Sequence, residues 1–290
     1  MRITNSLMTD TLQNNIGQGL SNLNSLQLQL STGKQLNAPS DDPAGTALSM
    51  SLRSNIQDNT QYIKNGQQGS DIMKLTDSAL NDATNLIDQA RSIASQAANS
   101  TQTTDSLNAL TAQVDAISQQ LTNIANTTYA GKYIFSGAKT TTPPYIAGDP
   151  THTYQGDTGS MKATIGPGNT QSVSTPGSVV FNSIFTSMTN LKAALVSGNI
   201  TNISNQITSL DASTSITSTV RATLGAQINE FDTVNQRLSR ANIEFQDTIS
   251  KVEDVDLAQT YVKLQSAQNV YQASLSVTAQ AFKYSLTNYL

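Results

Sequence analysis

Residues 257–290 read LAQTYVKLQSAQNVYQASLSVTAQAFKYSLTNYL, and only Lys263 and Lys283 in this stretch are charged. Positions at alternating spacings of four and three are apolar or aromatic except at Gln268, Thr278 and Ser285, which predicts a helix with a heptad seam and a few polar breaks. A surface helix normally carries Lys and Glu on its outer face, whereas this one carries Gln, Asn, Ser, Thr and Ala. Amides and hydroxyls tolerate burial against a neighbour better than unpaired charges do. The stretch is therefore typical of a helix that copies of the same chain surround.

The other end of the chain shows the same pattern. Residues 11–33 contain no Asp, Glu, Lys or Arg, and leucine or isoleucine recurs at helical spacing. We expect the helices at the two ends to pair as a coiled coil and to form the surface through which the chain polymerises. The predicted assembly seam consists of Leu12, Ile16, Leu20, Leu23, Leu30, Leu257, Tyr261, Leu264, Tyr271, Leu275, Phe282 and Tyr289.

The composition excludes several classes of protein. Charged residues make up 12% of the chain and periodic apolar residues 37%, so the chain is polar but not disordered. A net charge of −4 gives no attraction for phosphate backbones, and we expect no nucleic acid partner. The absence of cysteine excludes disulfides and thiolate metal sites. No apolar run is long enough for a membrane span, so we expect no membrane insertion. Residues 1–10 lack the basic and apolar regions of a secretory signal, so we expect no cleaved signal peptide.

Helical periodicity also fills most of the chain between the two ends. It runs from about residue 43 to 100, weakened at Gly66 and Gly69, continues after a short polar loop, and resumes near Asn182. From Tyr129 the pattern changes: residues 132–136 favour a strand, and Gly and Pro separate short segments at 161–165 and 178–181. The predicted fold is mainly α and nested. It comprises a terminal coiled-coil polymerisation domain (1–40 plus 255–290), an α-helical bundle of long helices (41–137 plus 183–254) and a small β-rich inserted domain (138–182).

Few residues suggest a catalytic or metal-binding site. His152, the only histidine, lies in a loop rich in Gly and Pro, and we interpret it as a solvated loop residue because no nucleophile or further metal ligand accompanies it. Two acidic clusters, Asp41-Asp42 and Glu253-Asp254-Asp256, precede helices and are interpreted as helix caps rather than as a cation site. No phosphate loop or nucleophile elbow is present. The sequence predicts no catalytic, cofactor or metal site, and thus no enzyme.

Two motifs carry a resemblance to a known family. Residues 30–48 read LSTGKQLNAPSDDPAGTAL and resemble the signature of the bacterial flagellins, in which Leu-Ser-Ser-Gly precedes an apolar-Asn pair, Asp-Asp, Ala-Gly and Ala. Residues 249–258 read ISKVEDVDLA and resemble the second flagellin motif, an apolar residue followed by Glu-Asp, Asp and Ala. The resemblance implies a structural subunit of the bacterial flagellum with flagellin-like architecture. It also implies that seven residues of these motifs form helix starts and linkers: Gly33, Asn37, Asp41, Asp42, Gly45, Asp254 and Asp256.

Within this family, two further stretches resemble the subunits of the hook–filament junction. They are residues 1–8, MRITNSLM, and residues 129–144, YAGKYIFSGAKTTTPP. This resemblance implies a homo-oligomeric ring that links hook-associated protein 1 to flagellin. It also implies export through the flagellar type III apparatus, with a cytoplasmic export chaperone, to the extracellular flagellum. A short flagellin that forms the filament itself is the alternative, and a soluble coiled-coil adaptor is a remoter one.

Overall fold

The computed structural model describes residues 2–99 and 103–287. Helices account for most of these residues, and the strands among them are short, which confirms the prediction of a mainly α fold. No described helix combines the length and the hydropathy that a membrane span requires.

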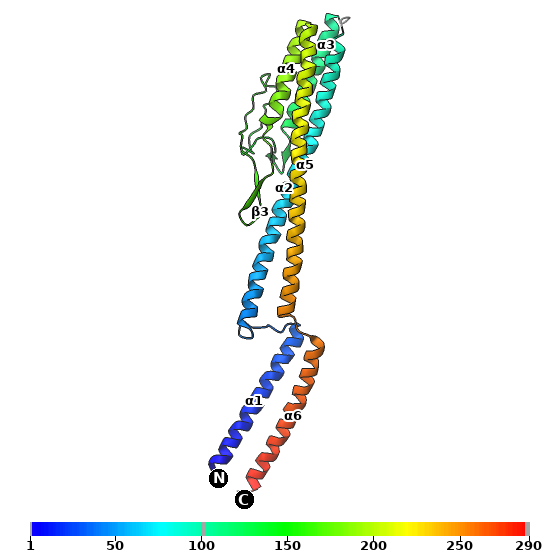
Figure 1. The fold of residues 1–290 in the computed structure, drawn as a ribbon. Coiled ribbons are helices and arrows are strands. Elements are labelled where there is room, and N and C mark those ends of the chain that lie inside the picture. Colours follow the sequence, from blue (N-terminus) through cyan, green and yellow to red (C-terminus); the bar gives the residue numbers. More distant parts are fainter. Residues whose placement is uncertain (1, 100–102, 288–290) are drawn as a thin grey trace. The chain divides into compact units, whose positions relative to one another are not determined.

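The chain divides into two compact units. The terminal unit comprises Met1–Asp58 and Ala241–Leu290, and the central unit comprises Asn59–Arg240. Two long helices, α2 (Pro43–Ala97) and α5 (Ile200–Glu253), contribute residues to both units (Figure 1). The predicted division into three domains stays a prediction.

In the terminal unit, α1 (Arg2–Thr32) and α6 (Leu257–Thr287) lie side by side (Figure 1). The first helix ends at Thr32, because Gly33 adopts a φ of 70° that most residues avoid, and its N–H donates to the carbonyl of Gln29. Residues with small or apolar side chains fill the contact between the two helices. Leu26 and Leu264 are buried, and a Cβ on Gly19 would lie 3.4 Å from the Tyr271 ring.

The central unit is a bundle built on α2, α5, α3 (Thr104–Ala125) and the shorter α4 (Phe181–Ser197). Its core follows the heptad pattern of the sequence, and α3 packs against α4. Thr103 caps α3 by accepting a hydrogen bond from the Ser106 N–H, and Gly198 ends α4 with a φ of 64°. Fully buried side chains of this core include Met73, Leu80, Ile87, Leu121, Ile184, Met188, Leu191, Leu210 and Phe231.

Gly66 and Gly69 do not interrupt α2, although the sequence predicts a weak point there. Both glycines instead let another element approach the helix closely. A Cβ on Gly69 would lie 2.7 Å from a methyl group of Val173 and 2.9 Å from the Phe231 ring, and a Cβ on Gly66 would lie 2.5 Å from Asn235 Oδ1. The two residues therefore serve packing rather than flexibility.

The strand segments form two small hairpins. β1 (Thr128–Tyr129) pairs antiparallel with β2 (Lys132–Tyr133), and β3 (Lys162–Gly166) pairs antiparallel with β4 (Asn169–Ser172). The predicted segment at 161–165 thus corresponds to β3 with a shift of one residue.

Two sequence predictions for this region are wrong. The strand predicted over 132–136 ends at Tyr133, because the next residues leave the hairpin and bury their side chains, with the Phe135 ring packed edge-on at 4.9 Å from Phe181. The segment 178–181 is not extended either, since Gly177–Val179 forms a 3₁₀ turn that leads directly into α4.

His152 is a third correction. It is half-buried rather than solvated, because the irregular segment that carries it folds over α3 and α4, and its ring contacts Ser118 and Phe185. Sequence periodicity cannot reveal this contact, since Ser118 is 34 positions away in the chain.

Candidate assembly site

The predicted seam residues of α6 divide into two groups. Leu264 is buried and Tyr271 is half-buried, and both face α1. Leu257, Tyr261 and Leu275 are exposed, with 54%, 57% and 43% of their surface accessible. A helix turns by about 100° per residue, which places these three residues together on one flank of the α1 contact. The side chain of Phe282 and the whole of Tyr289 lie outside the described part of the structure.

The seam residues of α1 divide in the same way. Leu12, Ile16, Leu23 and Leu30 are half-buried, and Leu20 is exposed. The pairing of α1 with α6 thus covers only part of the apolar surface that the two helices carry.

A second apolar stripe lies on α6, away from α1. Val262, Val270 and Val277 are spaced by eight and seven residues, or about two helical turns, so they share a face. Their exposed fractions are 66%, 62% and 56%. The described residues of the subunit thus leave more than half of each of these three side chains uncovered.

The chain leaves α1 and enters α6 at one place. The Gln35 N–H donates to the Glu253 carbonyl at 2.7 Å, and the Val255 N–H donates to the Gly33 carbonyl at 3.0 Å. These bonds pair Lys34 with Asp254 in a short antiparallel bridge. Two segments from opposite ends of the sequence are thereby held together at the base of the helical pair.

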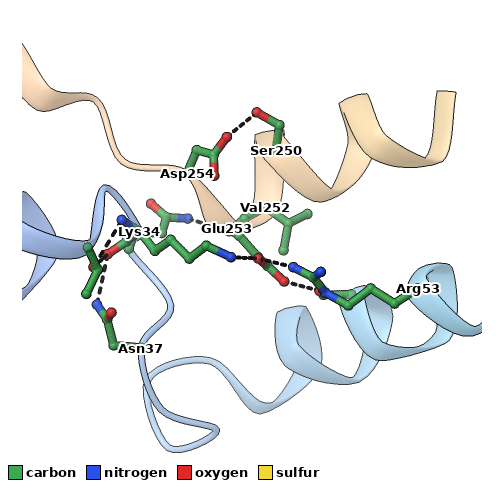
Figure 2. Close-up of polar contacts among 10 residues, drawn as sticks. Lys34, Asn37, Arg53, Ser250, Val252, Glu253 and Asp254 are labelled. Atoms are coloured by element: carbon green, nitrogen blue, oxygen red, sulfur yellow. Dashed lines mark hydrogen bonds and ion pairs between the residues drawn. The ribbon is translucent and has the colours of Figure 1, made fainter. Parts of the chain in front are cut away.

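Glu253 is the centre of an ionic cluster beside this bridge (Figure 2). Its Oε2 lies 2.6 Å from Lys34 Nζ and 2.7 Å from Arg53 Nη2, and its Oε1 accepts a hydrogen bond from the Ser49 hydroxyl. The carboxylate is buried, whereas the two cationic side chains remain about half exposed. The cluster joins the linker after α1, the second and third turns of α2 and the last turn of α5.

The same contacts determine the protonation of Glu253. Burial alone raises the pKa of this carboxyl, but the hydrogen bonds from Lys34, Ser49 and Arg53 outweigh it and lower the pKa from 4.5 to about 2. The side chain is therefore charged at neutral pH.

The acidic motif residues have different roles from one another. Asp42 caps α2 through the Ala44 N–H, next to Pro43, and Asp256 caps α6 through the Gln259 N–H. Asp41 instead folds the linker, because its carboxylate accepts from the N–H groups of Asn37 and Ala38, which also lowers its pKa.

Asp254 and Glu253 do not cap α6, which corrects the interpretation of the second acidic cluster. Asp254 accepts from the Ser250 hydroxyl, and Glu253 faces the cations. Gly45 lies close to the Asp42 carboxylate, and Asn37 donates to the Lys34 carbonyl at 2.8 Å (Figure 2).

Sequence reasoning missed Lys34, Ser49 and Arg53 as partners of Glu253. The sequence did offer one signal. Charged residues are rare in this chain, and the two cations Lys34 and Arg53 lie in or just after the flagellin-like motif of residues 30–48. No group of three His, Asp or Glu side chains within residues 2–99 and 103–287 is arranged to hold a metal ion. The contacts of this site join the linker after α1 to α2 and α5.

Comparison with known sequences decides the family. The model of the bacterial flagellin N-terminal helical region matches residues 3–140, and that of the C-terminal helical region matches residues 207–290. The chain belongs to the bacterial flagellin family. The matched parts contain the terminal helices, the bridge between them and the Glu253 cluster, and they leave out most of the irregular middle of the sequence.

Within the flagellin family, similarity over the whole length is to hook-associated proteins. Flagellar hook-associated protein 3 of Salmonella typhimurium is 28% identical over 298 residues, 92% of this chain and 93% of the relative. The protein of the same name from Escherichia coli is 28% identical over 275 residues, with coverages of 85% and 86%. A flagellin of Salmonella rubislaw is 35% identical, but over 47% of this chain and 26% of its own length. These findings confirm the resemblance to the junction subunits and favour it over a filament flagellin.

Solved structures show the same fold. A flagellar hook-associated protein from Vibrio parahaemolyticus aligns with a TM-score of 0.66 and 16% identity, covering 74% of this chain and 100% of its own. The flagellar junction protein of Legionella pneumophila aligns with a TM-score of 0.58 and 15% identity, covering 73% and 100%.

Proposed function

We propose that the chain is a structural subunit of the bacterial flagellum at the hook–filament junction, and that it polymerises through its terminal helices. The observation that carries this proposal is the apolar surface left on α6 after it has paired with α1. The flagellin family membership and the similarity to hook-associated protein 3 along the whole chain support it. The described site has no catalytic arrangement, and the relatives are structural flagellar proteins, so we propose no enzymatic activity.

The seam residues then have two roles. Leu264 and Tyr271 of α6, and the half-buried Leu12, Ile16 and Leu23 of α1, hold the helical pair within one subunit. The exposed residues Leu257, Tyr261 and Leu275, and the valine stripe of α6, contact neighbouring subunits. Full burial of a leucine or valine side chain contributes roughly 1.5–3 kcal/mol. Several such side chains per subunit give assembly a large driving force, and the scarcity of charge on both helices keeps the cost of burying their other faces low.

The partners belong to the same proposal. We infer a homo-oligomeric ring that lies between hook-associated protein 1 and flagellin, in the extracellular part of the flagellum. The subunit reaches this place through the flagellar type III apparatus, with a cytoplasmic chaperone that covers the apolar terminal helices before export. Long helices with little charge and an uncovered apolar stripe are prone to aggregate. A chaperone that covers the stripe prevents this before export.

One substitution tests the proposal. Leu275→Asp places a charge on the exposed flank of α6, and we expect the variant to lose incorporation into the flagellum and motility in a strain without its own subunit. Its urea unfolding should stay within about 0.5 kcal/mol of wild type, because surface changes away from packed sites have small effects. Val196→Asp is the control, since Val196 is an exposed apolar residue of α4 in the central unit, and it should retain motility. Normal motility of Leu275→Asp refutes the proposed role of this face.

A further inference from the structure

His152 links an irregular turn of the central unit to two helices of the bundle. Its ring stacks on Phe185 of α4, with centroids 4.3 Å apart and planes at 14°. Its Nε2 lies 3.1 Å from the hydroxyl oxygen of Ser118 on α3. The backbone φ of His152 is 46°, in the left-handed region that non-glycine residues adopt uncommonly. The side-chain contacts therefore hold a turn that its own backbone does not favour.

The turn comprises residues 146–153, most of which are exposed. Its internal hydrogen bonds centre on Asp149, whose carboxylate accepts from the N–H and the hydroxyl of Thr151 and whose carbonyl accepts from the His152 N–H. Ile146, at the start of the turn, is half exposed. The His152 ring is thus its anchor on α3 and α4.

The environment of this ring favours the neutral form. Nδ1 is buried and has no hydrogen-bond partner among the described residues. Burial lowers the pKa of His152 from 6.5, and Lys192 of α4 lowers it further, whereas the Pro150 carbonyl and Asp149 raise it.

Two further groups surround this cluster. Asp115 of α3 pairs with Lys192 at 2.7 Å and offsets part of that cation's charge. Tyr145, which contacts Phe185 at a centroid distance of 4.8 Å, stays protonated because burial raises its pKa.

We propose that His152 is a pH-sensitive clamp, whose protonation releases the turn 146–153 from α3 and α4 and uncovers the Phe185 ring. In a protonated ring Nδ1 becomes a buried donor that forms no hydrogen bond in the clamped state. The Pro150 carbonyl and Asp149 favour the imidazolium, but the loss of water on burial outweighs them. Attraction between the imidazolium and the Phe185 ring opposes release. In the released turn the His152 ring has its ordinary pKa, near 6.5. Below this pH, each pH unit shifts the equilibrium toward the open turn by up to about tenfold, until the pH also falls below the pKa of the clamped ring.

The first test follows the ring itself in the full-length protein. Because the chain has one histidine, its C2 proton gives a single titrating NMR signal that needs no variant for assignment. We expect a midpoint below pH 6.5. A midpoint at or above 6.5 overturns the proposal, because protonation then does not oppose the clamp.

The second test follows the turn. Amide exchange of residues 146–153, corrected for the intrinsic effect of pH, should be up to about tenfold faster at pH 5.5 than at pH 7.5. The β3–β4 hairpin, residues 162–172, should not respond and is the internal control. His152→Gln has a similar size and no charge, so its turn should exchange at a rate that does not depend on pH. The same pH response in His152→Gln, or no response in wild type, contradicts the clamp.

Discussion

Lys34 Nζ lies 2.6 Å from Glu253 Oε2, so a residue just after the first helix is bound to the last turn of α5 across 219 positions of sequence. Arg53 and Ser49 of α2 bind the same carboxylate. The buried carboxylate of Glu253 therefore binds together the segments that follow α1 and precede α6.

Removing the charge of Glu253 should loosen this tie. We expect Glu253→Gln to lower the free energy of unfolding in urea by about 1–3 kcal/mol, because Lys34 and Arg53 lose their anion but stay partly solvated. Asp247→Asn is the matched control, since Asp247 pairs with Lys251 on the exposed surface of the same helix, and its effect should stay below about 0.5 kcal/mol. Equal effects of the two substitutions exclude a special role for the cluster.

Acid should remove the contribution of Glu253 over a defined range. Its pKa in the folded protein, about 2, lies below the ordinary value of 4.5. Lowered carboxyl pKa values stabilise the fold above the unfolded-state pKa, so the stabilisation is complete above pH 4.5 and is lost as the pH falls toward 2. The difference in unfolding free energy between wild type and Glu253→Gln should therefore shrink across this range. A difference that is constant from pH 7 to pH 2.5 argues against the ion pairs as its source.

Replacing Gly69 of α2 by alanine should lower the stability of the protein, and the same change at Gly225 of α5 should raise it. Gly69→Ala should destabilise the central unit by about 1–3 kcal/mol, although alanine favours helices, because the new methyl group meets Val173 and Phe231. Gly225→Ala in α5 has no heavy atom within 4 Å of its new methyl group, and should stabilise by about 0.5–1 kcal/mol. Thermal unfolding by circular dichroism measures both. If Gly69→Ala is instead more stable than wild type, Val173 and Phe231 can move aside for the methyl group without a loss of stability.

The isolated subunit should have labile ends. α1 and α6 bury part of one face against each other and leave the rest of their apolar surface uncovered, which is too little to stabilise two helices of 31 residues fully. We expect amides before about residue 40 and after about residue 255 to exchange with solvent much faster than those of the central bundle. Slow exchange at both ends in a verified monomer shows that folding does not depend on assembly.

The helical part of the fold follows from local features of the sequence. Heptad spacing locates Leu80, Ile87 and Leu121 in the core, and the pair Asp42 and Pro43 specifies where α2 begins, because both signals act within a few turns. The strand prediction at 132–136 failed because β propensity does not distinguish a paired strand from an extended segment whose side chains, such as that of Phe135, enter a core.

The candidate site was only partly predictable. Heptad spacing identified apolar residues of α6, but not which of them α1 covers, since that depends on the rotation of both helices about their axes. Neither the partners of Glu253 nor the stacking of His152 on Phe185 was visible, because these contacts join residues that are distant in sequence and belong to no local repeat. Long-range pairing of single polar side chains requires the fold itself.

Electron microscopy of the purified subunit tests the central claim most directly. The protein is incubated at high salt alone, and in parallel with hook-associated protein 1 and flagellin. A junction subunit should remain monomeric or form short assemblies when alone, and should be incorporated between its two neighbours when both are present. Long filaments of the subunit alone, of the kind that a flagellin forms, contradict the account.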